Sequence, residues 1–168
     1  AVLVPFWRTE KLEAGQEAVI LKQFGKLIPK ADHRFRMERM LYSERVRSAE
    51  RLAGLADARP LARAWTAVIR NERNARKLLD AVPASQRAAG FFFAESRYLR
   101  RQKKFTQAAV VMLKAPADKA ALVDPDAWWP ERRVLSRELL DIGEIKTAYA
   151  IVAAHAADSP EAVADAEF

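Results

Sequence analysis

The sequence predicts an all-α fold, built as a string of helical hairpins. Ala, Leu and Arg are abundant, only five of the 168 residues are Gly, and runs of Val, Ile and Thr are few; this composition favours helices over sheets. Apolar residues recur with a helical period, and Pro or Gly interrupts them at intervals too short for long single helices. A chain of this length suits one domain with a sizeable core.

The order of the expected helices follows from helix breakers and capping signals. A first helix over residues 10–24 ends where Gly25 and Pro29 interrupt the pattern. Asp32 is the expected N-cap of the second helix, because its side chain can accept a hydrogen bond from the first turn. Further helices are expected over residues 46–55, 60–71, 75–82, 84–101, 104–115, 125–142 and 145–156.

Three of the expected hairpins look like copies of one unit. In each, an apolar residue opens the second helix, Ala follows three positions later, and another apolar residue follows six positions after the opener. Ala at the inner position lets the two helices approach closely. Such units are typical of tetratricopeptide-like solenoids, although their spacing here is irregular. The three sets are Val46, Ala49 and Leu52; Phe105, Ala108 and Val111; and Ile145, Ala148 and Ile151.

The segment over residues 121–157 has an unusual composition, with an Asp-Pro pair, a Trp pair and a Glu-Arg-Arg run. It resembles a segment of the superhelical domain of soluble lytic transglycosylases, the bacterial enzymes that cleave peptidoglycan. The resemblance is weaker over residues 24–114. It is carried by Asp124, Pro125, Trp128, Trp129, Glu131, Arg132, Arg133, Leu135, Leu139, Leu140, Asp141, Gly143, Ala148 and Tyr149.

The resemblance implies a right-handed superhelical array, an α-solenoid, in a periplasmic enzyme that cleaves peptidoglycan to 1,6-anhydromuropeptides. Peptidoglycan or muropeptides would be partners of the whole enzyme. Ser159 and Pro160 are typical of a helix start, yet only eight residues follow Pro160. We therefore expect residues 1–168 to form a single superhelical domain, without an active site, in a longer protein whose catalytic domain lies beyond residue 168.

The residues that could carry catalysis are scattered. The chain has no Cys, and His33 and His155 are its only histidines, so neither has a partner at metal-ligand spacing. Glu95 and Ser96 reproduce the Glu-Ser dipeptide of the lytic transglycosylases, but the Gly-Leu-Met-Gln motif that follows it in the family does not follow here. No Gly-rich phosphate loop is present. We expect no catalytic residue, metal or other cofactor in this segment.

Charge is distributed unevenly along the chain. Residues 30–104 contain 19 basic and 8 acidic residues, whereas residues 105–168 contain 6 and 11. Four basic residues share one face of a predicted helix, and a second stripe begins at Arg73, Arg76 and Lys77. Arg binds carboxylates bidentately, so the first stripe is a candidate site for the carboxylates of peptidoglycan; the alternative is a solubilising surface. The stripe consists of Arg97, Arg100, Arg101 and Lys104.

The aromatic clusters favour packing over ligand binding. Trp128 and Trp129 are about 100° apart on a helix, so we expect at least one of them to be buried. The run over residues 91–93, which is Phe-Phe-Phe, is expected in the core. Two functions remain open: a scaffold segment of a lytic transglycosylase, and a stand-alone adaptor that binds protein partners. Neither a nucleic-acid partner nor a membrane span is expected, because the sequence shows no base-reading motif and no long apolar run.

Overall fold

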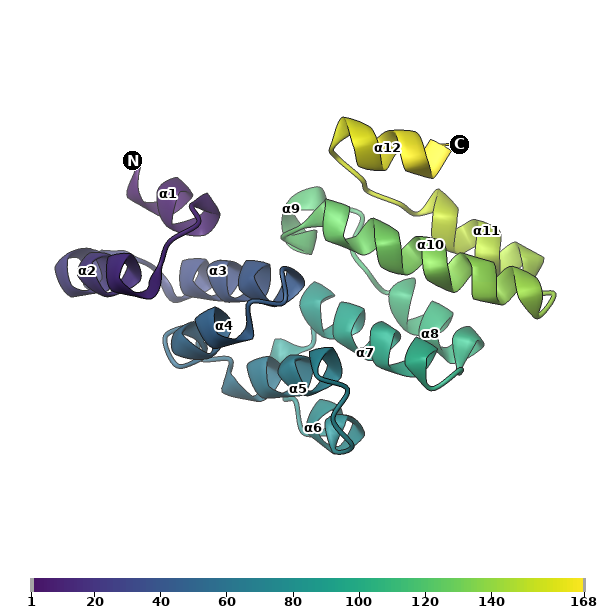
Figure 1. Ribbon diagram of the computed structural model, residues 1–168, viewed down its shortest axis with the longest axis horizontal. Coiled ribbons are helices and arrows are strands. Elements are labelled where there is room, and N and C mark those ends of the chain that lie inside the picture. The colour runs from purple at the N-terminus through teal and green to yellow at the C-terminus, as the bar shows by residue number, and fades with distance from the viewer. Residues whose placement is uncertain (1, 168) are drawn as a thin grey trace.

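The computed structural model describes residues 2–167, and its regular elements there are all helical (Figure 1), so the all-α prediction is confirmed. Two short 3₁₀ helices, over Gly25–Leu27 and Ala84–Gln86, accompany the α-helices. The α-helices of this part of the chain are α1 (Leu3–Thr9), α2 (Ala14–Phe24), α3 (Lys30–Tyr42), α4 (Val46–Ala53), α5 (Arg59–Ile69), α6 (Ala75–Asp80), α7 (Ala89–Arg101), α8 (Phe105–Met112), α9 (Lys119–Leu122), α10 (Pro125–Asp141), α11 (Ile145–Ala153) and α12 (Pro160–Glu167).

Helices that follow one another pack in pairs: α3 with α4, α5 with α6, α7 with α8, and α10 with α11. The first helices of the pairs also contact each other in series, α3 against α5, α5 against α7, and α7 against α10. Each second helix also contacts the first helix of the next pair: α4 contacts α5, and α8 contacts α10. The hydrophobic core is therefore continuous from one hairpin to the next (Figure 1).

The hairpin turns share one backbone motif. After α7, Lys103 adopts a left-handed conformation with φ 58°, and the amide of Lys104 donates to the carbonyl of Leu99 over 3.0 Å. This is the Schellman arrangement, which satisfies carbonyls at the end of a helix. The equivalent left-handed residues at the ends of the other first helices are Glu44, Asn71 and Gly143. One turn geometry thus accepts four residue types, of which only Gly143 avoids the steric cost of positive φ.

The repeated positions lie where the sequence predicts them. Val46, Phe105 and Ile145 are the first residues of α4, α8 and α11. The inner alanines of these helices are buried against the preceding helix, and so are the apolar residues that follow them. The buried residues are Ala49, Ala108, Ala148, Leu52, Val111 and Ile151.

An aromatic cluster joins the four first helices. Trp65 of α5 stands edge-on to Tyr42 of α3, with ring centroids 4.7 Å apart, and Phe93 of α7 lies 4.9 Å from Tyr42. Trp128 of α10 packs on Phe93 at 5.2 Å and donates from Nε1 to the Tyr42 hydroxyl over 3.0 Å. Edge-to-face pairs add stability beyond the area they bury, so this cluster fixes how successive hairpins meet.

Gly90 sets the distance between α5 and α7. A Cβ atom at this position would lie 2.5 Å from the Trp65 ring and 3.0 Å from a carboxylate oxygen of Glu38. Both neighbours are buried, with little room to move. Gly at this position therefore allows α7 to pack directly on the aromatic cluster.

Several predicted boundaries are wrong. Asp32 is not an N-cap: α3 begins at Lys30, and Asp32 lies in its first turn, where its carboxylate accepts a hydrogen bond from Arg8. The helix predicted over residues 84–101 is broken, because Ala84–Gln86 form a 3₁₀ helix, Ala88 is extended and α7 begins at Ala89. Gln86 holds this break against the start of α5. Its side-chain oxygen accepts from the Leu61 amide over 3.2 Å, and its nitrogen donates to the Asp57 carbonyl over 3.2 Å.

The sequence analysis did not predict the two short helices α1 and α9. The helix predicted over residues 10–24 begins only at Ala14, where Glu13 and Gln16 form a capping box. Within the part of the chain that the structure describes, no helix is both long and apolar enough to cross a membrane.

Candidate functional site

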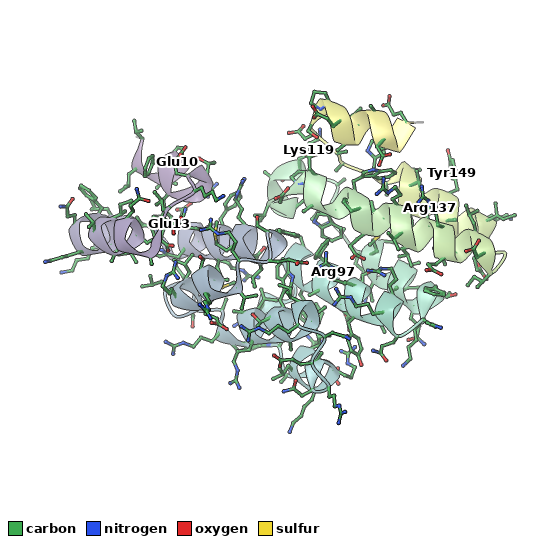
Figure 2. The ribbon with its side chains drawn as sticks, in the orientation of Figure 1. Glu10, Glu13, Arg97, Lys119, Arg137 and Tyr149 are labelled. Carbon is green, nitrogen blue, oxygen red and sulfur yellow. The ribbon has the colours of Figure 1, made fainter. Side chains whose placement is uncertain are left out.

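The predicted basic stripe lies on α7 at the contact with α10. Arg97 occupies the centre of the molecule (Figure 2) and donates from Nε to Glu131 over 2.8 Å. Arg100 binds the same carboxylate through Nε at 2.8 Å and Nη2 at 2.9 Å. Arg97 also contacts Glu44 at 3.0 Å. Two of the four stripe residues are therefore brought together on one buried acid from the neighbouring hairpin.

Glu131 is stabilised as a carboxylate despite its burial. Desolvation opposes ionisation, but the hydrogen bond from Arg100 and the positive charges of Arg97 and Arg100 outweigh it and lower the pKa of Glu131. The same contact raises the pKa of Arg100, because the hydrogen bond that Arg100 donates to Glu131 exceeds the penalty of burial. The arginines neutralise a charge inside the protein and have less capacity left for an external anion.

The other two stripe residues point elsewhere. Arg101 donates to the carbonyl of Val68 at the end of α5, and desolvation with the nearby charge of Arg97 lowers its pKa. Lys104 is exposed and forms no ion pair within residues 2–167. The stripe is thus a connection of α7 to α5 and α10, with Lys104 as its exposed end.

Several of the residues that carry the family resemblance build the same junction. The Asp124 side chain accepts from the amide of Ala127 over 3.2 Å and caps α10. Trp128 enters the aromatic cluster, while Trp129 faces the other way and donates to Asp165 of α12 over 2.6 Å. Both indoles are buried, as predicted for at least one of them.

Arg132 links α10 to α11 from inside the protein. Its Nη1 donates to the carbonyl of Ile151 over 3.0 Å, and its guanidinium lies 5.6 Å from the Trp128 ring. Burial lowers the pKa of Arg132 to about 10. A positive charge near the last turn of α11 is favourable because helix carbonyls are exposed there.

The residues considered for catalysis make structural contacts. Glu95 accepts a hydrogen bond from Arg76 over 3.1 Å, and the Ser96 hydroxyl is buried and donates to the Ala108 carbonyl over 3.0 Å. His33 packs edge-on against Trp7, and His155 against Trp129. Among the residues that the structure describes, no three potential ligands are grouped to hold a metal ion.

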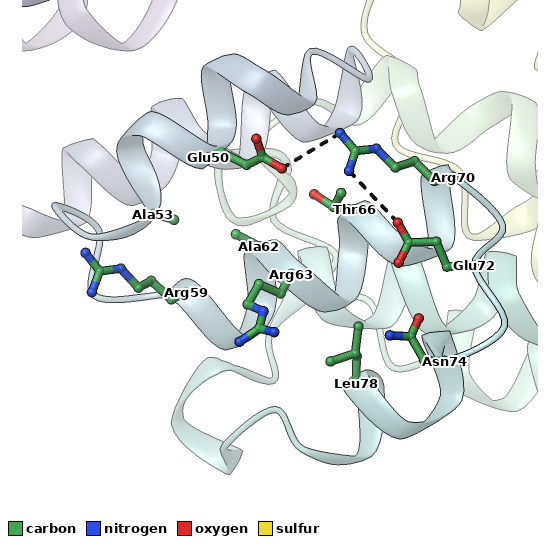
Figure 3. A pocket seen from close by; sticks show the side chains of 10 residues that line it. All are labelled: Glu50, Ala53, Arg59, Ala62, Arg63, Thr66, Arg70, Glu72, Asn74 and Leu78. Carbon is green, nitrogen blue, oxygen red and sulfur yellow. Dashed lines mark ion pairs between the residues drawn. The ribbon is translucent and has the colours of Figure 1, made fainter.

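A pocket of about 340 Å³ lies between α4, α5 and α6 (Figure 3). We call it the α5 pocket, because α5 and the turn that follows it supply most of its walls. A smaller hollow of about 210 Å³ adjoins it and shares three of its residues. The α5 pocket is lined by Glu50, Ala53, Arg59, Ala62, Arg63, Thr66, Arg70, Glu72, Asn74 and Leu78.

The polar groups of the α5 pocket are weakly engaged. Arg70 lies 3.8 Å from Glu50 and 3.9 Å from Glu72, which is too far for hydrogen bonds. Arg59 and Arg63 have no carboxylate of residues 2–167 within ion-pair distance. Thr66, only 6% exposed, has a buried hydroxyl without a hydrogen-bond partner in the described chain.

Sequence reasoning missed this pocket, although a signal was present. Arg59, Arg63, Thr66 and Arg70 are spaced by four, three and four residues, which places them on one face of a helix. The stripe is less conspicuous than that of α7, because apolar residues separate its members. Of the two stripes, the one on α5 faces a pocket.

Comparison of the chain with models of protein families, with curated proteins and with solved structures found no significant match.

Proposed function

We propose that this chain is a non-catalytic scaffold segment of a periplasmic lytic transglycosylase, and that its hairpins belong to a right-handed superhelical array. In such an enzyme the array would position or surround glycan strands for a catalytic domain elsewhere in the protein. The proposal assigns no reaction to residues 1–168.

One observation carries the proposal. Several of the residues that resemble the family have a structural task at the junction of α10 with its neighbours: Asp124 caps the helix, Trp128 fills the core, and Glu131 holds two arginines of α7. A pattern so dependent on helix packing suits a scaffold. The serial contacts of α3, α5, α7 and α10 also suit an array that extends by adding hairpins.

Binding to intact cell wall tests the proposal most directly. The protein should cosediment with purified peptidoglycan sacculi, and added salt should weaken the binding because the chain carries a formal net charge of +7. Reading the gene beyond the codon for Phe168 provides the second test. Further hairpins followed by Glu-Ser and Gly-Leu-Met-Gln would support the proposal; absence of both that motif and sacculus binding would reject it.

The basic stripe has its own test within this proposal. Substituting Arg97 or Arg100 would also disrupt Glu131, so loss of binding would have two explanations. Lys104 is exposed, and Lys104→Gln changes the stripe without touching the junction. If the stripe contributes to wall binding, this variant should bind sacculi more weakly; Lys146→Gln, on the exposed surface of α11, is the matched control.

An adaptor that binds a protein partner is the second candidate, and exposed apolar side chains on the last hairpin favour it. Ile145 and Tyr149 of α11 are 67% and 75% exposed, and Tyr149 points away from the body of the protein (Figure 2). Leu140 and Ile142 beside the turn are about half exposed. A contiguous exposed apolar patch is typical of an interaction surface. An Ile145→Ser and Tyr149→Ser variant that loses a partner but keeps sacculus binding would separate the two functions.

A further inference from the structure

We infer that the α5 pocket binds a small monoanionic carboxylate that carries a short apolar group, such as the carboxyl-terminal end of a peptide. The inference goes beyond the scaffold function and does not depend on it. It rests on the charge of the pocket, on an unpartnered hydroxyl in its wall and on its size.

The charges of the pocket favour one negative charge on the ligand. Three arginines and two glutamates line it, which leaves one net positive charge. Arg63 is one turn from Thr66 on one side, and Arg70 is one turn away on the other. A guanidinium can hold a carboxylate by two parallel hydrogen bonds. A dianion such as phosphate would be repelled by Glu50 and Glu72, which lie on either side of Arg70.

The Thr66 hydroxyl supplies the second, independent observation. A buried hydroxyl without a partner is unfavourable, and native proteins contain few of them. Thr66 lies in the pocket wall between Ala62 and Arg70 (Figure 3), and its hydroxyl oxygen is covered. A rotation of the side chain toward the pocket would let this hydroxyl donate to a carboxylate oxygen bound beside α5. The ion pair of Arg70 with Glu50 is loose enough, at 3.8 Å, to separate when the ligand enters.

The size and remaining walls of the pocket restrict the rest of the ligand. Ala53, Ala62 and Leu78 give it an apolar side, which suits a methyl or similarly short alkyl group. A volume of about 340 Å³ is near the lower end for small-molecule sites, so the pocket holds an amino-acid-sized group and excludes a sugar chain.

N-acetylalanine is the probe, because it carries one carboxylate and one methyl group. Titration into the ¹⁵N-labelled protein should shift the amide signals of Thr66 and its neighbours, with a dissociation constant on the order of 1 mM. N-acetylalanine amide, which lacks the carboxylate, should cause no saturable shift. Arg63→Gln should weaken binding about tenfold or more, and Thr66→Val should weaken it severalfold in a folded protein.

Arg73→Gln is the matched control, because Arg73 is exposed beside Glu72 but does not line the pocket. It removes the same charge and should leave binding within about twofold of wild type. The inference is overturned if N-acetylalanine fails to saturate, if phosphate binds equally well, or if Arg73→Gln and Arg63→Gln weaken binding alike. Because the probe contains no glycan, its result is independent of sacculus binding.

Discussion

Two helices of this protein carry arginines along one face, and the structure uses them differently. On α7, Arg97 and Arg100 converge on Glu131, which is buried and belongs to α10. On α5, Arg59 and Arg63 meet no carboxylate at ion-pair distance within residues 2–167 and stand beside a pocket. The spacing within each helix is similar, so the difference comes from the helices that face them. α10 supplies a buried acid that both arginines bind. α4 supplies Ala53 and Glu50, and α6 supplies Leu78. Glu50 lies 3.8 Å from Arg70 and is not at ion-pair distance from Arg59 or Arg63.

Removing the acid should show how strongly the α7 arginines are engaged. Glu131→Gln would leave Arg100 without its ion-pair partner and Arg97 with only the exposed Glu44, and breaking a buried pair in this way costs about 3–5 kcal/mol. Partial exposure of both arginines places the expected loss near the lower end of that range. Urea unfolding followed by circular dichroism measures it. The paired substitution Arg59→Gln and Arg63→Gln is the control on α5 and should change stability by no more than about 0.5 kcal/mol.

The pH dependence of the unfolding free energy should reveal the buried acid that pairs with the arginines of α7, which the arginines of α5 lack among the described residues. The pKa of Glu131 is lowered in the folded protein from an unfolded value near 4.5. Its contribution is therefore complete above about pH 4.5 and is lost as the pH falls through the folded pKa. The difference in unfolding free energy between wild type and Glu131→Gln should be constant near neutral pH and shrink below pH 4.5. A difference that grows on acidification would contradict the assignment.

The contact between α5 and α7 offers the next largest effect. Gly90→Ala would push a methyl group into Trp65 and Glu38, and overpacking of a dense core costs about 1–3 kcal/mol. Thermal unfolding measures the loss. Gly15→Ala is the control, because a Cβ atom there meets nothing within 4 Å in the exposed part of α2; alanine should be neutral or slightly stabilising at this helical position.

The smallest predicted effect has the opposite sign. Thr66→Val keeps the shape of the side chain and removes a hydroxyl that has no partner in the described structure. The variant should be as stable as wild type or more stable, by up to about 1 kcal/mol. Destabilisation in denaturant titrations would mean that the hydroxyl is satisfied in solution, and it would weaken the case for a ligand at Thr66.

The same comparison shows which features of the structure could be predicted from the sequence and which could not. The repeat of an apolar opener with an inner Ala predicted where α4, α8 and α11 begin, because helix pairing is a local property that leaves a local pattern. The partner that each arginine binds, in contrast, is not determined by its neighbours in the sequence. Glu131 is more than thirty positions from Arg97 and Arg100, and only the packing of α10 on α7 brings them together. The break before α7 was missed for the same reason, since Gln86 binds Leu61 in α5 and Asp57 just before α5, which lie 25 and 29 positions away.

The aromatic cluster of Tyr42, Trp65, Phe93 and Trp128 makes the middle of the protein observable by spectroscopy. Its two indoles are held rigidly by one phenylalanine from a third helix, and Tyr42 touches both of them. Rings fixed in this way give near-ultraviolet circular dichroism that disappears when the helices separate, even if each helix persists. The native chromophores thus report whether the hairpins remain stacked, without any added label.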